Sequence, residues 1–176
     1  MSHIRKGAND VNLEQAQKAL FLTDIECDWH SLLQEITNIL PENMLTIQCY
    51  GPVISNPYGD IMRSIIIAIY QEKVEEIYVV GTKNSEALSA NVLIELDSMK
   101  EKIRTLDYLF QHSRPEFLRG TVHEWLNENS HDRIEKCVNI IYHHPLVPQN
   151  VKVRGLIIDH EDGKPSIVEV SPQVTV

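Results

Sequence analysis

The sequence has no long hydrophobic run. Its longest uninterrupted aliphatic stretch, from Ile65 to Ile69, spans only five positions, whereas a membrane-spanning helix needs about 20 apolar residues. The first residues, MSHIRKGANDVN, are polar and charged and contain no apolar segment typical of a secretory signal. We therefore expect no membrane insertion and a cytoplasmic location.

The sequence also lacks any run of basic residues. It holds 16 Lys and Arg against 25 Asp and Glu, a formal net charge of −9. An acidic chain repels the phosphate backbone of nucleic acids unless its basic side chains are concentrated in one patch. We therefore expect no nucleic-acid partner.

Cysteine is scarce, with three residues far apart at Cys27, Cys49 and Cys137. An odd number without regular spacing argues against a disulfide framework and suits a reducing cytosol. The chain also contains neither a Walker loop nor a GxGxxG pattern, which are the two common phosphate-binding glycine motifs.

What is present is ordinary for a globular domain. The 176 residues are 43% hydrophobic and 23% charged, enough to bury a core. No repeat, low-complexity tract or linker interrupts them. We expect residues 1–176 to form a single domain, with 1–17 as an N-terminal arm or helix; a helix would fit the segment 11–20.

Short apolar segments bounded by turn residues predict parallel strands, at 18–25, 44–51 and 75–81. Apolar residues spaced three or four apart predict helices, at 28–40, 61–73, 85–113 and 131–144, the last ended by Pro145. A shorter, broken helical region is predicted at 114–129. The C-terminal segment reads as two strands joined by a turn at Asp162-Gly163.

These elements predict an α/β fold. A central, mostly parallel sheet is flanked by helices and carries a C-terminal antiparallel hairpin strand. Binding sites in such sheets lie at the carboxyl ends of the strands. In this sequence those ends fall near 24–26, 48–51 and 81–85.

Four segments at and around these strand ends resemble the β-class carbonic anhydrases. RSIIIAIYQEKVEEIYVVGTKNS and IYHHPLVPQNVKVRGLIIDHEDGKPSIVEV carry most of the likeness. ALFLTDIE stands where that family has Cys-x-Asp-x-Arg, and MLTIQCYG where it has a strand ending in Arg-Asn-Ala-Gly. The resemblance implies the β-carbonic anhydrase fold and a homodimer with its cleft at the interface, crossed by the segment 11–20.

The same resemblance implies that the zinc ligands of the family are missing. Leu22, Thr82 and Ser85 stand where the family has Cys, His and Cys, and Glu26 replaces the Arg of an Asp-Arg pair. Leucine cannot coordinate zinc, and hydroxyls are poor zinc donors. Hydration of carbon dioxide by this route needs a metal-bound hydroxide. We therefore expect no cofactor and a pseudoenzyme, in which Asp24 is the only matching member of the catalytic pair.

A displaced zinc site is an alternative. Cys27, His30 and Cys49 could ligate a metal near the ends of the first two strands, and the protein would then be an active carbonic anhydrase (carbonate dehydratase) or a related lyase. Under the simpler interpretation, the two cysteines are small buried residues and His30 is a surface residue.

The turn GTKNSEA suggests a different ligand. Thr82, Lys83, Asn84 and Ser85 lie where a strand meets the start of a helix, and exposed backbone N–H groups with a lysine can bind a small anion such as bicarbonate. Ordinary helix capping by Asn84 or Ser85 explains the same residues. The sequence therefore predicts a zinc-less protein with a binding or regulatory role, for a small anion or a protein partner.

Overall fold

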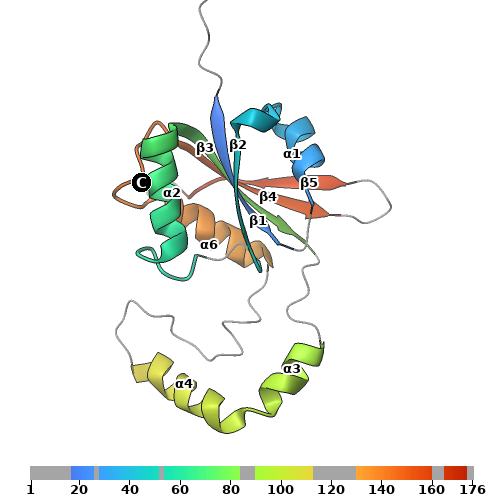
Figure 1. Cartoon of the computed structure of the whole chain (residues 1–176), viewed down its shortest axis with the longest axis vertical. Coiled ribbons are helices and arrows are strands. Elements are labelled where there is room, and N and C mark those ends of the chain that lie inside the picture. Colours follow the sequence, from blue (N-terminus) through green and yellow to red (C-terminus); the bar gives the residue numbers. More distant parts are fainter. Residues whose placement is uncertain are drawn as a thin grey trace, which may run out of the picture.

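The computed structural model describes residues 17–25, 28–51, 54–83, 90–112, 130–159 and 165–173. Within these ranges five strands form one sheet in the order β2-β1-β3-β4-β5 (Figure 1). Strands β1 to β4 run parallel, and β5 is antiparallel to β4. The strands are β1 (Lys18–Asp24), β2 (Met44–Cys49), β3 (Val74–Thr82), β4 (Lys152–Asp159) and β5 (Ser166–Val170). The predicted sheet with its antiparallel C-terminal strand is confirmed.

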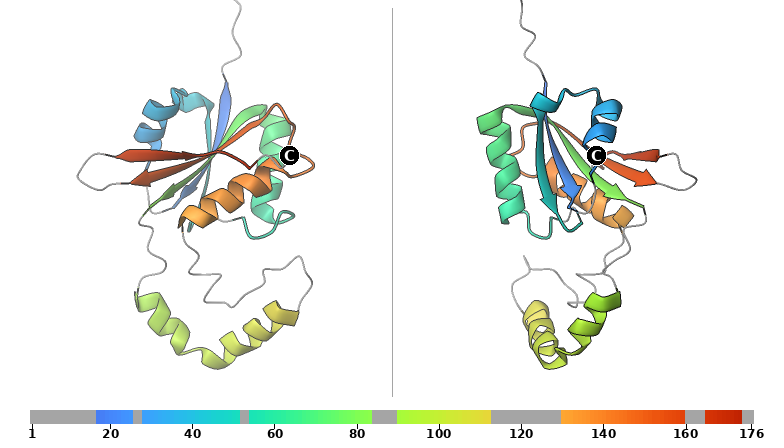
Figure 2. Two further views of the ribbon diagram at one scale, coloured as in Figure 1. Left: turned by 180° about the vertical axis from the view of Figure 1, so that it is seen from behind. Right: turned by 45° about the vertical axis from the view of Figure 1, so that its right-hand side comes forward.

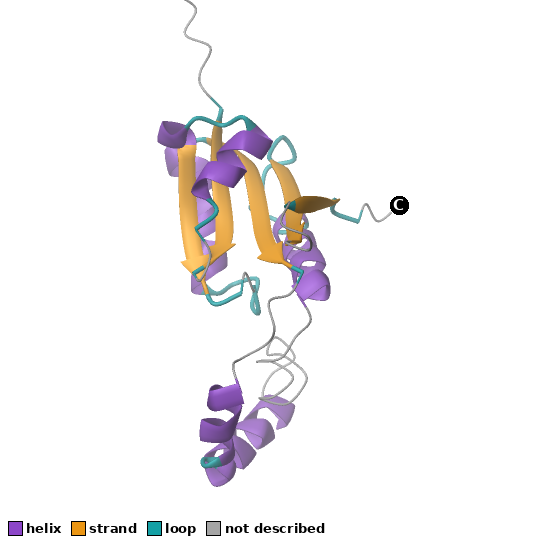
Figure 3. Cartoon of the chain, turned by 90° about the vertical axis from the view of Figure 1, so that its right-hand side faces the viewer, coloured by secondary structure: helices purple, strands orange, loops and turns teal. Residues whose placement is uncertain are grey.

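Helices cover both faces of this sheet. One face packs against α1, and the opposite face packs against α2 and α6 (Figures 1 and 2). Figure 3 shows α3 and α4 beyond the carboxyl ends of the strands, away from the sheet. The helices are α1 (His30–Thr37), the short 3₁₀ helix η1 (Pro41–Asn43), α2 (Asp60–Glu72), α3 (Ala90–Asp97), α4 (Lys100–His112) and α6 (Ser130–Tyr142).

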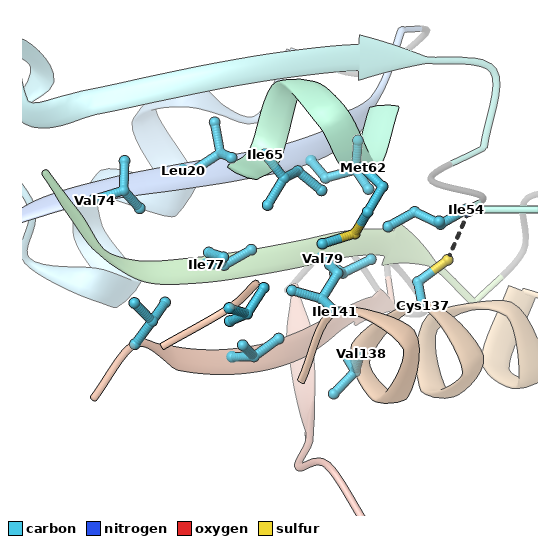
Figure 4. Packing of buried hydrophobic residues seen from close by; sticks show 14 of the residues in the cluster. Leu20, Ile54, Met62, Ile65, Val74, Ile77, Val79, Cys137, Val138 and Ile141 are labelled. Atoms are coloured by element: carbon cyan, nitrogen blue, oxygen red, sulfur yellow. Dashed lines mark hydrogen bonds between the residues drawn. The ribbon is translucent and has the colours of Figure 1, made fainter. Parts of the chain in front are cut away.

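The larger core lies between the sheet and the helices α2 and α6. Successive side chains of a strand point to opposite faces, so Leu20 and Leu22 of β1 enter this core, whereas Phe21 packs on the α1 side. Figure 4 shows the core, where the backbone N–H of Ile54 donates to Sγ of Cys137 at 3.0 Å. This bond ties the loop after β2 to α6.

The prediction of one long helix over 85–113 is wrong in its centre. Helix α3 ends at Asp97 and α4 begins at Lys100. The hydroxyl of Ser98 donates to the carbonyl of Glu95 at 2.6 Å, and the N–H of Met99 donates to the carbonyl of Leu96 at 2.9 Å. The N–H of Ser98 is shared between the carbonyls of Ile94 at 3.3 Å and Glu95 at 3.1 Å. The helix therefore tightens into bonds between residues three apart and ends, because a serine side chain competes for backbone groups.

Three further predictions lie wholly or partly outside the described residues. A helix over 11–20 is wrong at its end, because Lys18–Leu20 belongs to β1; residues 11–16 lie outside the described residues. The region 114–129 and the turn at 162–163 also lie outside them. In the part of the chain that the structure describes, no helix is long and apolar enough to span a membrane.

Candidate functional site

The carboxyl ends of three neighbouring strands bring polar side chains together. Asp24 is the last residue of β1, Thr82 is the last of β3, and Asp159 is the last of β4. Lys83 follows directly after β3. Because β3 lies between β1 and β4 in the sheet, these residues line the edge of the sheet formed by the carboxyl ends of its parallel strands. Ligands of parallel α/β sheets bind at this carboxyl-end edge.

Lys83 is held by two contacts with β4. Its ammonium Nζ lies 2.6 Å from Oδ2 of Asp159, and its backbone N–H donates to the carbonyl of Ile158 at 3.0 Å. A hydrogen bond between two charged groups is roughly twice as strong as one between neutral groups. The lysine predicted to attract an anion therefore already shares its charge with a carboxylate of the chain.

Asp24 is buried, with 8% of its surface exposed. Its Oδ2 accepts a hydrogen bond from the backbone N–H of Gly51 at 3.3 Å. Gly51 has a φ of 62°, a conformation that glycine adopts without the cost that other residues bear. This bond offsets part of the free-energy cost of burying the Asp24 carboxylate. It also joins the end of β1 to the loop after β2.

Leu22 does not lie at the strand end. Its side chain is fully buried and belongs to the core formed with α2 and α6, two residues before the end of β1. Thr82 is half-buried at the end of β3, while Glu26, Asn84 and Ser85 lie outside the described residues. On this face of β1, the side chain that reaches the end is the carboxylate of Asp24.

The described side chains at this edge do not fit a zinc ion of the carbonic anhydrase type. That site needs a tetrahedral set of thiolate and imidazole donors. The described strand ends offer one thiol, that of Cys49 at the end of β2, together with carboxylates, a hydroxyl and an ammonium, and no imidazole. Among the residues that the structure describes, no group of three or more His, Cys, Asp or Glu side chains is placed to hold a metal.

The displaced metal set is not brought together either. Cys49 packs against the core on the α2 face, with its thiol donating to the carbonyl of Gly51 at 3.1 Å. His30 begins α1 on the other face, where it lines a small hollow with Thr23, Trp29 and Thr46. The sheet thus separates His30 from Cys49, and Cys27 lies outside the described residues.

Asp159 is the site residue that sequence reasoning missed. The sequence did contain a signal for it, because Asp159 directly follows the apolar strand segment VRGLII and therefore stands at a strand end. Its pairing with Lys83 depends on the parallel register of β3 and β4, in which Thr82 lies opposite Ile158. That register cannot be read from the sequence.

Comparison with other proteins gives a relative over nearly the whole chain. The "Putative carbonic anhydrase-like protein YbcF" of Bacillus subtilis (strain 168) is 64% identical over 160 residues, 91% of each chain. The chain belongs to the carbonic anhydrase-like family. A more distant member, "Putative carbonic anhydrase YtiB" of the same organism, is 28% identical over 160 residues, covering 86% of this chain and 81% of its own. No family model matches the sequence.

Solved structures show that this carbonic anhydrase-like chain has the fold of the β-carbonic anhydrases. β-Carbonic anhydrase isoform I of Trichomonas vaginalis superposes with a TM-score of 0.60 at 20% identity, covering 88% of this chain and 85% of its own. Tetrameric β-carbonic anhydrases of Sordaria macrospora include a chain with a TM-score of 0.51 at 14% identity, covering 89% and 84%. At these identities the likeness concerns the fold alone.

Proposed function

We propose that this carbonic anhydrase-like protein works without zinc, does not hydrate carbon dioxide, and has a binding or regulatory role. The ion pair of Lys83 and Asp159 at the carboxyl ends of β3 and β4, together with the buried Asp24 at the end of β1, carries the proposal. These side chains occupy the edge of the sheet where a zinc enzyme of this fold would need thiolates and an imidazole. Without a metal-bound hydroxide, hydration of carbon dioxide has no nucleophile at this edge.

Among possible ligands, the contacts of Lys83 favour a protein over a small anion. The ammonium and the backbone N–H of Lys83 are both engaged by β4, and the nearby carboxylates of Asp24 and Asp159 repel anions. Meanwhile α3 and α4 expose large apolar side chains, including Ile94 at 68% and Tyr108 at 61%. Exposed apolar groups of this kind are typical of surfaces that contact proteins.

The test of the zinc-less proposal combines two measurements on untagged protein. Elemental analysis would measure the zinc per chain, and stopped-flow measurement of carbon dioxide hydration would measure the rate above buffer. We expect neither zinc nor a catalysed rate. One zinc per chain together with catalysis would overturn the proposal and favour the displaced set Cys27, His30 and Cys49, which His30→Ala and Cys49→Ser would then test.

A small anion has its own test. Isothermal titration calorimetry of the protein with bicarbonate, with phosphate and with sulfate should show no saturable binding of any of the three anions. Saturable binding that is lost in Lys83→Met would reinstate the turn formed by residues 82–85 as an anion site.

We also propose that the protein is a homodimer. The tetrameric state named for the Sordaria macrospora structures supports assembly in this fold, and the exposed apolar residues of α3 and α4 suggest where a second copy would bind. Sedimentation equilibrium at micromolar concentration should give twice the chain mass. Ile94→Asp with Leu109→Asp should shift it to the monomer, whereas Leu40→Asp, an equally exposed apolar position near η1, should not. A monomer in the unmodified protein would reject the proposal.

A further inference from the structure

A small hollow lies between the start of α1 and the carboxyl ends of β1 and β2. Thr23 and Gln48 lie side by side in it, because they are paired in the parallel register of the two strands. The segment 28–33 supplies the other wall. The volume of the hollow is about 20 Å³, which is room for one water-sized group. It can therefore take the tip of a side chain but not a whole metabolite.

The hydroxyl of Thr23 is the polar group at the bottom of this hollow. Thr23 is only 3% exposed, and its hydroxyl has no hydrogen bond to any residue that the structure describes. The oxygen is not among the fully enclosed polar atoms either, so it is open to the hollow that the residue lines. A buried polar group costs free energy unless a hydrogen bond compensates it. The hydroxyl of Thr23 therefore favours a group that can bond to it.

Asp28 decides the sign of the charge in the hollow. It is the only carboxylate among the described lining residues, and its Oδ1 accepts a hydrogen bond from the backbone N–H of His30 at 3.4 Å. The start of a helix carries a partial positive charge of about half an elementary charge, which is smaller than the charge of the carboxylate. The hollow is thus negative on balance, as is the whole chain at −9, and favours a cation.

We propose that this hollow binds the ammonium group of a lysine side chain from a protein partner. An ammonium carries three donors and no acceptor, and Thr23, Gln48 and Asp28 each offer an acceptor oxygen. Lysine stems pack along apolar surface while the charged group stays among polar ones, and Trp29 and Leu33, which also line the hollow, offer such a surface. This inference rests on the proposed binding role, in which a protein is the favoured ligand, and names the group that is recognised.

Other side-chain tips fit the hollow less well. A carboxylate would be repelled by the carboxylate of Asp28, and an apolar tip would leave the hydroxyl of Thr23 without a bond. The guanidinium of arginine is planar and carries five donors in a rigid fork, and it is larger than the one water-sized group that the hollow admits. Size and charge together therefore select lysine.

The experiment is a titration of the ¹⁵N-labelled full chain with Nα-acetyl-lysine methylamide, followed by ¹H–¹⁵N NMR at pH 7.5. The amide signals of Thr23 and Gln48 should move saturably. Nα-acetyl-norleucine methylamide, which has the same aliphatic stem without the ammonium, should move neither signal. The corresponding arginine derivative should bind at least about tenfold more weakly than the lysine derivative.

Variants of the lining residues test the two contacts that carry the proposal. Thr23→Val keeps the branched shape and removes the hydroxyl, and Asp28→Asn removes the charge; each should weaken the binding of the lysine derivative about tenfold. Thr23→Ser, which keeps the hydroxyl, should bind like the unmodified protein. If Thr23→Val does not fold, Thr23→Ala gives the same comparison.

The chain offers a matched control for each variant. The hydroxyl of Thr37 donates to the carbonyl of Leu33 at 2.6 Å and does not line the hollow, so Thr37→Val should leave the affinity unchanged. Asp60 is an exposed carboxylate in the first turn of α2, and Asp60→Asn should also leave it unchanged.

The outcomes separate this inference from the proposed function. If the norleucine derivative moves the same signals as the lysine derivative, or if Thr23→Val binds lysine as tightly as Thr37→Val, the role given to the hollow is wrong. Equal effects of Asp28→Asn and Asp60→Asn would trace the binding to the overall negative charge and would also reject it. A zinc-less protein stands in all of these cases. Zinc with carbon dioxide hydration in the unmodified protein would instead overturn the proposed function.

Discussion

Lys152 and Glu76 bind each other across the first paired residues of β3 and β4, with Nζ of Lys152 2.9 Å from Oε1 of Glu76. Glu76 is buried and also accepts a hydrogen bond from the hydroxyl of Tyr78, whose ring stacks on Phe21 at 5.0 Å between centroids. With Lys83 and Asp159 at the opposite end, each end of the β3–β4 pair carries a lysine bound to a buried carboxylate.

Acid should weaken the fold through Glu76. Burial by itself raises the pKa of Glu76, but hydrogen bonds from Tyr78 and Lys152 outweigh it and hold the pKa below its ordinary value of 4.5. A lowered pKa in the folded state contributes stability above the unfolded value, which is lost as the pH falls below it. Urea unfolding across the acid range should therefore show a shallower pH dependence for Glu76→Gln.

At neutral pH, Glu76→Gln should cost about 1–2 kcal/mol, because a charge-assisted contact is lost. The neighbouring Glu75→Gln, at an exposed position, serves as the control and should change neither the stability nor its slope with pH. Equal acid slopes in Glu76→Gln and the unmodified protein would contradict the role of Glu76.

Alkali should weaken the fold through Tyr78. Burial, together with the hydrogen bond to Glu76 and the charge of that carboxylate, raises the pKa of Tyr78 above its ordinary value of 10.0. The fold thus favours the neutral phenol, and this stability is present below the unfolded pKa and lost as the pH rises above it. Tyr78→Phe should remove that alkaline dependence and cost about 1–2 kcal/mol at neutral pH.

Denaturant unfolding at several alkaline pH values would measure this dependence. Tyr70→Phe is the control, since the hydroxyl of Tyr70 lies on an exposed surface and donates to the carbonyl of Leu146. If Tyr78→Phe loses stability with rising pH as steeply as the unmodified protein, the prediction is wrong.

Gly155 of β4 should tolerate no side chain. A Cβ added there would lie 2.5 Å from Cγ2 of Ile134 in α6 and 3.0 Å from Cβ of Val170 in β5. Overpacking of this kind typically costs about 1–3 kcal/mol, so Gly155→Ala should lower the free energy of unfolding by that amount. At Gly59 the nearest atom would be the carbonyl oxygen of Asn56 at 3.2 Å, and Gly59→Ala should cost less. Equal stability losses in the two variants would count against this packing.

Leu22 should act as a core residue and not as a lost metal ligand. Leu22→Cys shortens a fully buried side chain and should cost about 2–4 kcal/mol through the cavity that it leaves. Because the position lies inside the strand, the new thiol should take up no zinc, as measured by elemental analysis after dialysis against zinc. Leu40→Cys, at an exposed position, is the control for adventitious zinc on a thiol. Zinc uptake specific to Leu22→Cys would show that this position can reach a metal.

Much of the fold could be predicted because its signals are local. The apolar segment around Val79 and Val80 indicated a buried strand, and both residues are buried in the core. The spacing of Ile134, Val138 and Ile141 indicated a helix with one buried face, and these three side chains do pack into the larger core. The break at Ser98 was missed because the apolar spacing continues across it, whereas the helix ends through short-range hydrogen bonds of Ser98 and Met99.

The candidate site was only partly predictable. Strand ends were located correctly, and with them Asp24, Thr82 and Lys83. The partner of Lys83 was not, because Asp159 lies 76 positions away along the chain. The separation of His30 from Cys49 likewise depends on which sheet face each side chain occupies.

The sequence by itself determined where strands and helices form and which of their side chains are buried, because propensity and hydrophobic period act over a few neighbouring residues. It also determined that no thiolate or imidazole stands at positions 22, 82 and 85. The tertiary structure alone decided that Lys83 meets Asp159 and that Lys152 meets Glu76. Those contacts follow from the register in which β3 and β4 pair, and register is set by the packing of the whole sheet against its helices.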